Sequence, residues 1–72
     1  MLHSMMPEAI TIQQMLVKFH NDGVEDSLIG DRVGGTLSVI RRLRTGGECR
    51  PTESLLMNIA KLYTEHQINF SN

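Results

Sequence analysis

Apolar residues recur at a helical spacing in the first third of the chain. The positions i, i+3, i+4 and i+7 of one helical face are occupied by Ile12, Met15, Leu16 and Phe19. Thr11 precedes this run and Gln14 follows three residues later, which is the spacing of a capping box. The sequence Asn21-Asp22-Gly23 closes the run. The pattern predicts a first helix of about ten residues.

A second, shorter apolar pattern covers residues 24–33. Its stripe is made of Leu28, Ile29 and Val33. Glu25 and Asp26 lie at its start, where acidic side chains suit the positive end of a helix dipole. The Gly34-Gly35 pair follows, and Gly34 is expected to supply the positive φ of a tight turn. The pattern predicts a second helix that ends at this pair.

A third pattern begins at Thr36, a residue type that caps helix N-termini. Ile40 and Leu43 form its inward pair, and Gly46-Gly47 ends it. Because only three residues separate it from the helix before, the two are expected to form the tight corner of a helix-turn-helix.

A fourth helix is predicted after Pro51 and Thr52, and is expected to reach about Glu65. Its apolar stripe consists of Leu55, Leu56, Ile59, Leu62 and Tyr63. Beyond it, Ile68 and Phe70 alternate with polar residues, which fits either an apolar contact with a second subunit or a disordered end. Residues 1–9 have no periodicity and are also expected to be flexible or dimer-contacting.

Length and composition indicate one small globular domain. The chain has 72 residues, of which 40% are hydrophobic, and no apolar run is long enough to cross a bilayer. The single Cys49 has no partner for an intramolecular disulfide, and no secretory segment follows Met1, so we expect a cytoplasmic location. The predicted fold is an all-α bundle of four, at most five, short helices.

Positive charge is concentrated in one window of the chain. All five arginines fall within residues 32–50 with Glu48 as the only acid, so this window carries +4, whereas the rest of the chain carries −5 and the total is −1. Such asymmetry can create a basic face on a mildly acidic protein. A solvated helical face is the simpler interpretation, but a merely solubilising surface would use lysine as readily as arginine.

The spacing of these features resembles the helix-turn-helix of the phage repressor and Cro family, which includes bacterial xenobiotic-response-element-like regulators. The resemblance covers about residues 11–65. It rests on Gly23, Ile29-Gly30, Val33-Gly34, Ile40 with Leu43, Gly46 and Arg50-Pro51. Gly30 also has a physical reason, because a small residue there lets the third helix cross close to the second.

The resemblance implies a lambda-repressor-like domain whose third helix enters the major groove of double-stranded DNA. The base-contacting positions would be Leu37, Ser38, Arg41 and Arg42, with Arg42 the first candidate to read a guanine. The phosphate-contacting positions would be Arg32, Thr36 and Arg50. The function implied is transcription regulation, as a phage or prophage Cro-type repressor that binds a palindromic operator as a homodimer.

Several positions depart from the family pattern. Glu25 and Asp26 stand where an acid would repel a DNA phosphate, and Gly35 replaces an apolar turn residue, which predicts a looser corner. Arg44 stands where the family often has a glutamate paired with a helix-one arginine, and Phe19 occupies that helix-one position. Arg44 would then either stack on Phe19 or point to water.

Other chemistry finds little support in the sequence. His3, His20 and His66 are scattered, with no partner at metal-ligand spacing, and the glycine pairs form no phosphate-binding loop, so we expect no metal, no cofactor, no small-molecule ligand and no enzymatic activity. The competing function is a small protein-interaction module, in which the same helices serve as a scaffold without DNA binding.

Overall fold

The structure is a computed structural model that describes residues 10–71, and among these the side chains of 10–68. It is all-helical, as predicted. The four helices are α1 (Ile12–Asn21), α2 (Asp26–Val33), α3 (Leu37–Thr45) and α4 (Glu53–Ser71), and the described residues form no strand. The predictions for residues 1–9 and for the side chain of Phe70 lie outside this description.

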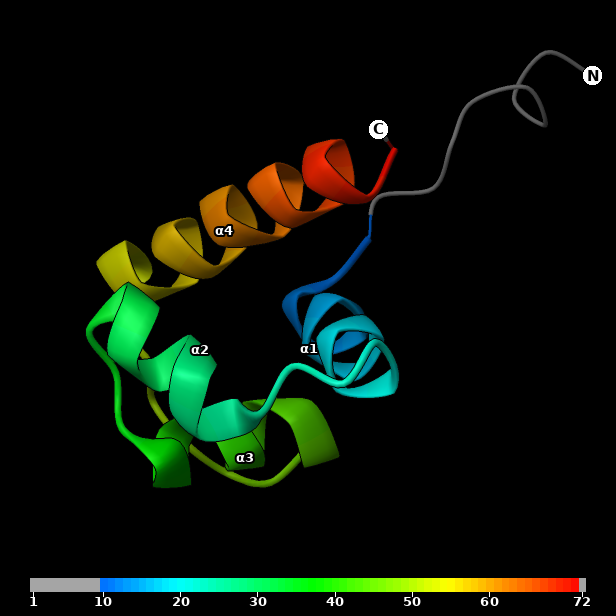
Figure 1. The fold of residues 1–72 in the computed structure, drawn as a ribbon. Helices are drawn as coiled ribbons and strands as arrows, with labels where there is room; N and C mark the ends of the chain where they lie inside the picture. The colour runs from blue at the N-terminus through cyan, green and yellow to red at the C-terminus, as the bar shows by residue number, and fades with distance from the viewer. Residues whose placement is uncertain (1–9, 72) are drawn as a thin grey trace, which may run out of the picture.

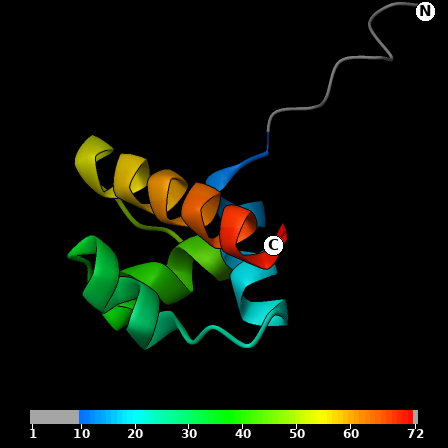
Figure 2. The same ribbon diagram turned by 45° about the horizontal axis from the view of Figure 1, so that its top comes forward.

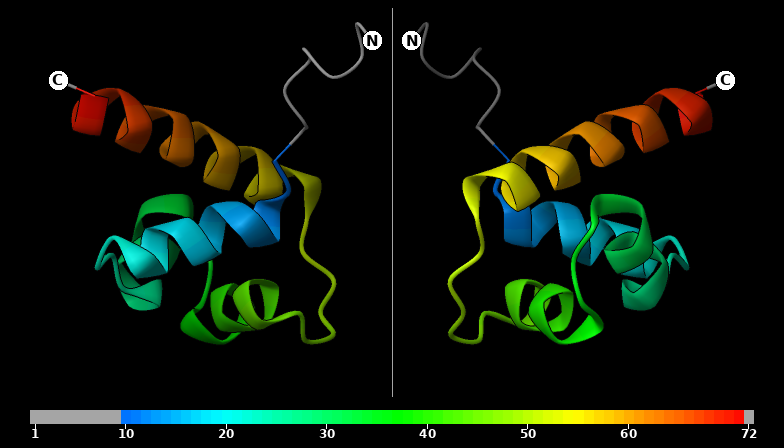
Figure 3. Two further views of the ribbon diagram at one scale, coloured as in Figure 1. Left: turned by 90° about the vertical axis from the view of Figure 1, so that its right-hand side faces the viewer. Right: turned by 90° about the vertical axis from the view of Figure 1, so that its left-hand side faces the viewer.

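The helices form two sides around a shared core. Helix α3 packs against α1 and α2, and α4 packs against the same two helices. Figures 1 and 3 show α4 along one side of the molecule and α3 along the opposite side, with α1 and α2 between them. The loop 46–52 connects the two sides, and it is also visible in Figure 2. Helix α3 is therefore carried on the face of the domain remote from α4.

Hydrogen bonds at the predicted caps explain where the helices begin. The Thr11 hydroxyl accepts a bond from the backbone N–H of Gln14 at 3.1 Å, and Gln14 Oε1 accepts one from the Thr11 N–H at 2.9 Å. These reciprocal bonds complete the predicted capping box. The hydroxyl of Thr52 accepts from the N–H of Leu55 at 3.1 Å at the start of α4.

The core is built from the stripes that face inward on each helix. It consists of Leu16, Phe19, Ile29, Val33, Ile40 and Ile59, all buried. Phe19 is its largest fully buried side chain, with the Tyr63 ring edge-on at 5.7 Å and the His66 ring tilted at 4.9 Å between centroids. His66 also lies 3.0 Å from a carboxylate oxygen of Asp22, which ties the second half of α4 to the end of α1.

The glycines at the α2–α3 corner take the roles expected of them, with one difference. Gly34 has φ +77°, and a Cβ on Gly30 would lie 3.2 Å from the Gly35 carbonyl oxygen, so Gly30 makes room for the backbone of the turn that leads into α3. The looser corner predicted from Gly35 is wrong. A Cβ at Gly35 would lie 3.1 Å from a methyl carbon of Leu55, so α4 already fills this space.

Two predicted helices have different limits or faces in the structure. Helix α2 begins at Asp26, and its buried stripe is Asp26, Ile29, Gly30 and Val33, whereas Leu28 is 46% exposed. The predicted inward position of Leu28 is therefore wrong. Helix α4 continues to Ser71, so its predicted end at about Glu65 is wrong and residues 67–71 are helical. None of the helices in the described region has the length and apolarity needed to span a membrane.

Candidate nucleic-acid interface

Helix α3 starts immediately after the three-residue turn that follows α2. Thr36 is its N-cap, with its hydroxyl accepting a hydrogen bond from the backbone N–H of Val39 at 3.2 Å. The Thr36 hydroxyl only accepts in this bond, it donates to no acceptor among the described residues, and the residue is exposed. Thr36 can therefore cap the helix and still donate to an anion, as its predicted phosphate contact requires.

The four predicted base-contacting residues lie together on the exposed surface of α3. They are Leu37, Ser38, Arg41 and Arg42. Leu37 is 42% exposed in the first turn of this helix. Ile40 is fully buried on the opposite side of the helix, and Leu43 packs against the core beside it. The inner pair thus anchors α3 while its other face stays accessible.

Arg41 and Arg42 leave α3 on different flanks. Arg41 lines a shallow hollow with Leu37 and the beginning of α2. The aliphatic carbons of Arg42 lie against Gly47, because a Cβ built on that glycine would be 3.4 Å from Arg42 Cγ. The two guanidinium groups are therefore available on both sides of the exposed face, one toward α2 and one toward the loop after α3.

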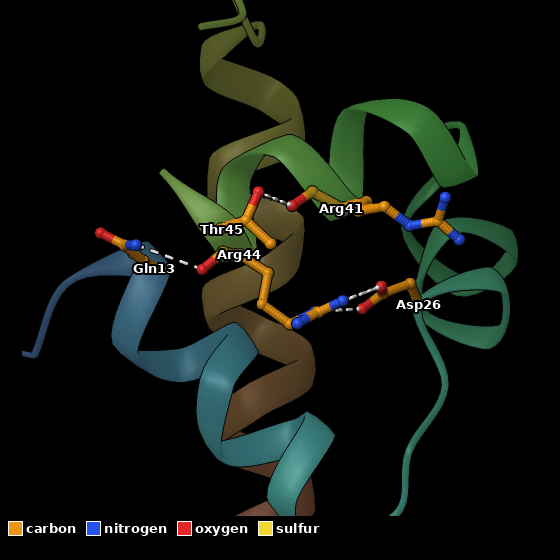
Figure 4. Close-up of polar contacts among 5 residues, drawn as sticks. All are labelled: Gln13, Asp26, Arg41, Arg44 and Thr45. Carbon is orange, nitrogen blue, oxygen red and sulfur yellow. Dashed lines mark hydrogen bonds and ion pairs between the residues drawn. The ribbon is translucent and has the colours of Figure 1, made fainter. Parts of the chain in front are cut away.

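Arg44 does not point to water or stack on Phe19, so both predicted alternatives are wrong. Its Nε donates to Asp26 Oδ1 at 3.0 Å and its NH2 donates to Asp26 Oδ2 at 2.9 Å, as Figure 4 shows. The side chains are 18% and 7% exposed, so this is a largely buried bidentate ion pair between α3 and α2. The hydrogen bonds to Asp26 raise the pKa of Arg44 above its ordinary value, against the effect of burial.

This ion pair changes the electrostatics that the sequence suggests for the start of α2. Asp26 was predicted to repel a DNA phosphate, but its carboxylate is saturated by Arg44 and hardly reaches solvent. Arg44 in turn is removed from the set of arginines available to a ligand. Of the two acids in question, only Glu25 is exposed, next to Arg41 in the same hollow.

The remaining predicted phosphate contacts, Arg50 and Arg32, lie on different parts of the molecule. Arg50 is exposed in the loop that follows α3. Arg32 is exposed as well, but it lines hollows with Asn58, Leu62 and Glu65 of α4. The structure therefore places Arg50 in the segment after α3 and Arg32 on the α4 side, away from the exposed face of α3.

Both ends of α3 are held by side chains. Besides the Thr36 cap at its beginning, Gln13 Nε2 of α1 donates to the backbone carbonyl of Arg44 at 3.2 Å, and Thr45 donates its hydroxyl to the Arg41 carbonyl at 2.9 Å (Figure 4). Carbonyls in the last turn of a helix have no partner within the helix, so a bond from α1 both satisfies one and fixes the position of α3.

Removal of one partner of the Asp26–Arg44 pair is expected to destabilise the domain more than removal of both. Arg44→Met leaves the Asp26 carboxylate buried without a counter-ion, and Asp26→Leu does the same to the guanidinium. The double variant removes both charges and adds apolar contact. The urea concentration at the midpoint of unfolding should therefore be higher for the wild type and the double variant than for either single variant. Equal midpoints for wild type and the single variants would show that the pair does not hold α3 to α2.

Metal ligation finds no geometric support in residues 10–68. No three side chains of His, Cys, Asp or Glu type in this range lie close enough together to hold an ion. Cys49 is half-buried in the loop before α4.

Comparison with known proteins identifies no relative of the chain. Neither the models of protein families, nor the curated proteins, nor the solved structures contain a match to the chain. Function is therefore inferred from the geometry of α3 and from the residues that it exposes.

Proposed function

We propose that the protein is a sequence-specific regulator that binds double-stranded DNA by placing the N-terminal half of α3 in the major groove. One observation carries this proposal: the exposed face of α3 combines Leu37, Ser38, Arg41 and Arg42 on a helix that follows a tight turn and is anchored by buried Ile40. A helix presented in this way matches the width of the major groove.

Each residue on this face has a chemical role in the proposal. Arg42 donates two hydrogen bonds to O6 and N7 of a guanine, and Ser38 bonds a base edge or a phosphate. Leu37 contacts a thymine methyl group. Arg41 approaches the groove from the α2 side. Thr36 and Arg50 position the domain on the phosphate backbone.

The charge distribution supports this orientation. Residues 37–45 contain three arginines and no acid. Because Arg44 neutralises Asp26, the uncompensated charges on this helix are those of Arg41 and Arg42, both exposed. Arginine favours the two-pronged contacts that guanine and phosphate offer. The acids that give the net charge of −1 lie outside α3, and of these Glu25 is exposed in the hollow that Arg41 lines.

We further propose that the protein is a regulator of the phage repressor and Cro type. The support lies in the lengths of α1 to α3, in the close crossing at Gly30 and in the left-handed glycine at Gly34. A single domain of this size makes few base contacts, so two copies are proposed to act together. On one palindromic operator both α3 helices would have to face the same side of the duplex, with half-sites roughly 34 Å apart.

Binding to labelled duplexes should fall steeply as salt rises. If two or three arginines neutralise phosphates, a fourfold increase in salt, from 50 to 200 mM, should weaken binding about ten- to fifty-fold, because each neutralised phosphate releases counter-ions. Fluorescence anisotropy measures this directly, and selection of bound fragments from random DNA supplies the best duplex. The proposal fails if no selected duplex binds more tightly than about 100 μM at low salt.

A further inference from the structure

A carboxylate that the fold does not use lies beside the exposed face of α3. Glu25 immediately precedes α2 and lines one hollow with Leu37 and Arg41 of α3. It is exposed, and although it is the N-cap residue of α2, its side chain makes no capping hydrogen bond. It also forms no ion pair with any residue in the range 10–68. The Glu25 carboxylate is therefore an acceptor that remains open to a ligand.

The other acid at this hollow is already occupied. Asp26 lines the hollow as well, but both of its carboxylate oxygens accept hydrogen bonds from Arg44. Figure 4 shows that Arg41 leaves α3 separately and takes no part in this pair. Among the described residues, the hollow therefore presents one uncommitted acceptor, Glu25, and one uncommitted donor, Arg41, at the edge of the proposed base-contacting surface.

A carboxylate at this edge has one kind of partner on a DNA base. An ionised carboxylate only accepts hydrogen bonds. In the major groove, cytosine and adenine each present an amino group that donates, whereas guanine and thymine present only acceptors. Every base pair carries one such amino group, so a carboxylate distinguishes which strand holds it. It attracts cytosine or adenine on the strand that it faces and repels guanine or thymine there.

Resting on the proposed function, we propose that Glu25 is a specificity-determining residue that selects cytosine or adenine at one position of the bound duplex. Its carboxylate accepts a hydrogen bond from the amino group of that base. Arg41, which lines the same hollow, donates to an acceptor on the same base pair or on the next one. Because phosphates repel a carboxylate, Glu25 lowers affinity for DNA in general and makes binding depend more strongly on sequence.

Glu25→Gln tests this role, because the amide keeps the size of the side chain, loses its charge and can both donate and accept. Anisotropy with the selected duplex and each of its single base changes gives the base preference at every position. The wild-type profile shows whether the preferred amino base is cytosine or adenine. In Glu25→Gln, the preference for that base over guanine and thymine should fall about fivefold or more. Affinity for random DNA should rise about two- to fivefold at low salt.

Two further variants locate the effect. Glu65→Gln makes the same change of charge on α4, on the side of the domain remote from α3, and is the matched control. It should leave the base preference at every position as it is in wild type. Arg41→Ala should change the preference at the position that Glu25→Gln changes, or at its neighbour, because the two residues line one hollow. Circular dichroism of each variant shows that it is folded.

Either of two results would overturn the role of Glu25. The first is a Glu25→Gln variant with the base preferences of wild type, whether or not its affinity for all duplexes is higher, because the carboxylate then contacts no base. The second is a change at positions more than one base pair apart in Glu25→Gln and Arg41→Ala. A wild-type chain that binds no duplex is a separate result, since it removes the DNA proposal itself and the role of Glu25 with it.

Discussion

Phe19→Ala is expected to remove a large part of the domain's free energy of unfolding. Phe19 is 1% exposed and its ring contacts Tyr63 and His66 of α4, so the truncation opens a cavity where α1 meets α4. Truncations of this kind cost about 3 to 5 kcal/mol. A domain of 72 residues has a total stability of about 4 to 11 kcal/mol, so the loss is of the same order as the whole.

Chemical unfolding followed by circular dichroism measures this effect. Val17→Ala on the same helix is the control, because Val17 is 40% exposed and a surface truncation should change stability by no more than about 0.5 kcal/mol. A Phe19→Ala variant with the unfolding midpoint of the Val17→Ala variant would contradict the core described above.

Arg42→Ala and Arg50→Ala are expected to weaken DNA binding in different ways. Loss of a two-pronged contact to guanine should cost about 1 to 3 kcal/mol at one base position and should relax the preference there. Loss of a phosphate contact at Arg50 should weaken binding to all sequences alike and reduce the salt slope by about one. Both residues are exposed, so neither substitution should unfold the domain.

A panel of duplexes with single base changes distinguishes these roles by anisotropy. For the Arg42→Ala variant, affinity should no longer depend on the base at one position. At the other positions it should depend on the base as it does for the wild type. The Arg50→Ala variant should keep the shape of the wild-type profile at lower affinity. If both variants lose the same affinity for selected and random DNA, Arg42 does not read a base.

The helices could be predicted from the sequence because local signals mark both ends of most of them. Thr11 and Thr36 make the cap bonds that their residue types favour, and Gly34 and Gly46 adopt the left-handed conformation that ends α2 and α3. The end of α4 could not be placed in this way. Residues 66–71 contain no glycine or proline to stop the helix, and the alternation of apolar and polar residues in this short segment lacks the helical period.

The exposed face of α3 was also predictable, because Ile40 and Leu43 fix which side is buried. The Asp26–Arg44 pair was missed, although its signal is present. Asp26 stands three residues before Ile29 and Arg44 stands four residues after Ile40, so both lie on the buried stripes of their helices. A charge on such a stripe requires an opposite charge nearby. The partner itself follows only from the way α2 and α3 pack.

The bonds that hold α3 at both ends have a consequence for the cost of recognition. With its beginning capped by Thr36 and its end joined to Asp26 and Gln13, α3 has its orientation set before any ligand arrives. Ordering a flexible segment during association reduces affinity, because conformational entropy is lost at that moment. Here that entropy is lost when the chain folds. A preorganised α3 therefore loses less conformational entropy on binding than a flexible segment with the same small surface would lose.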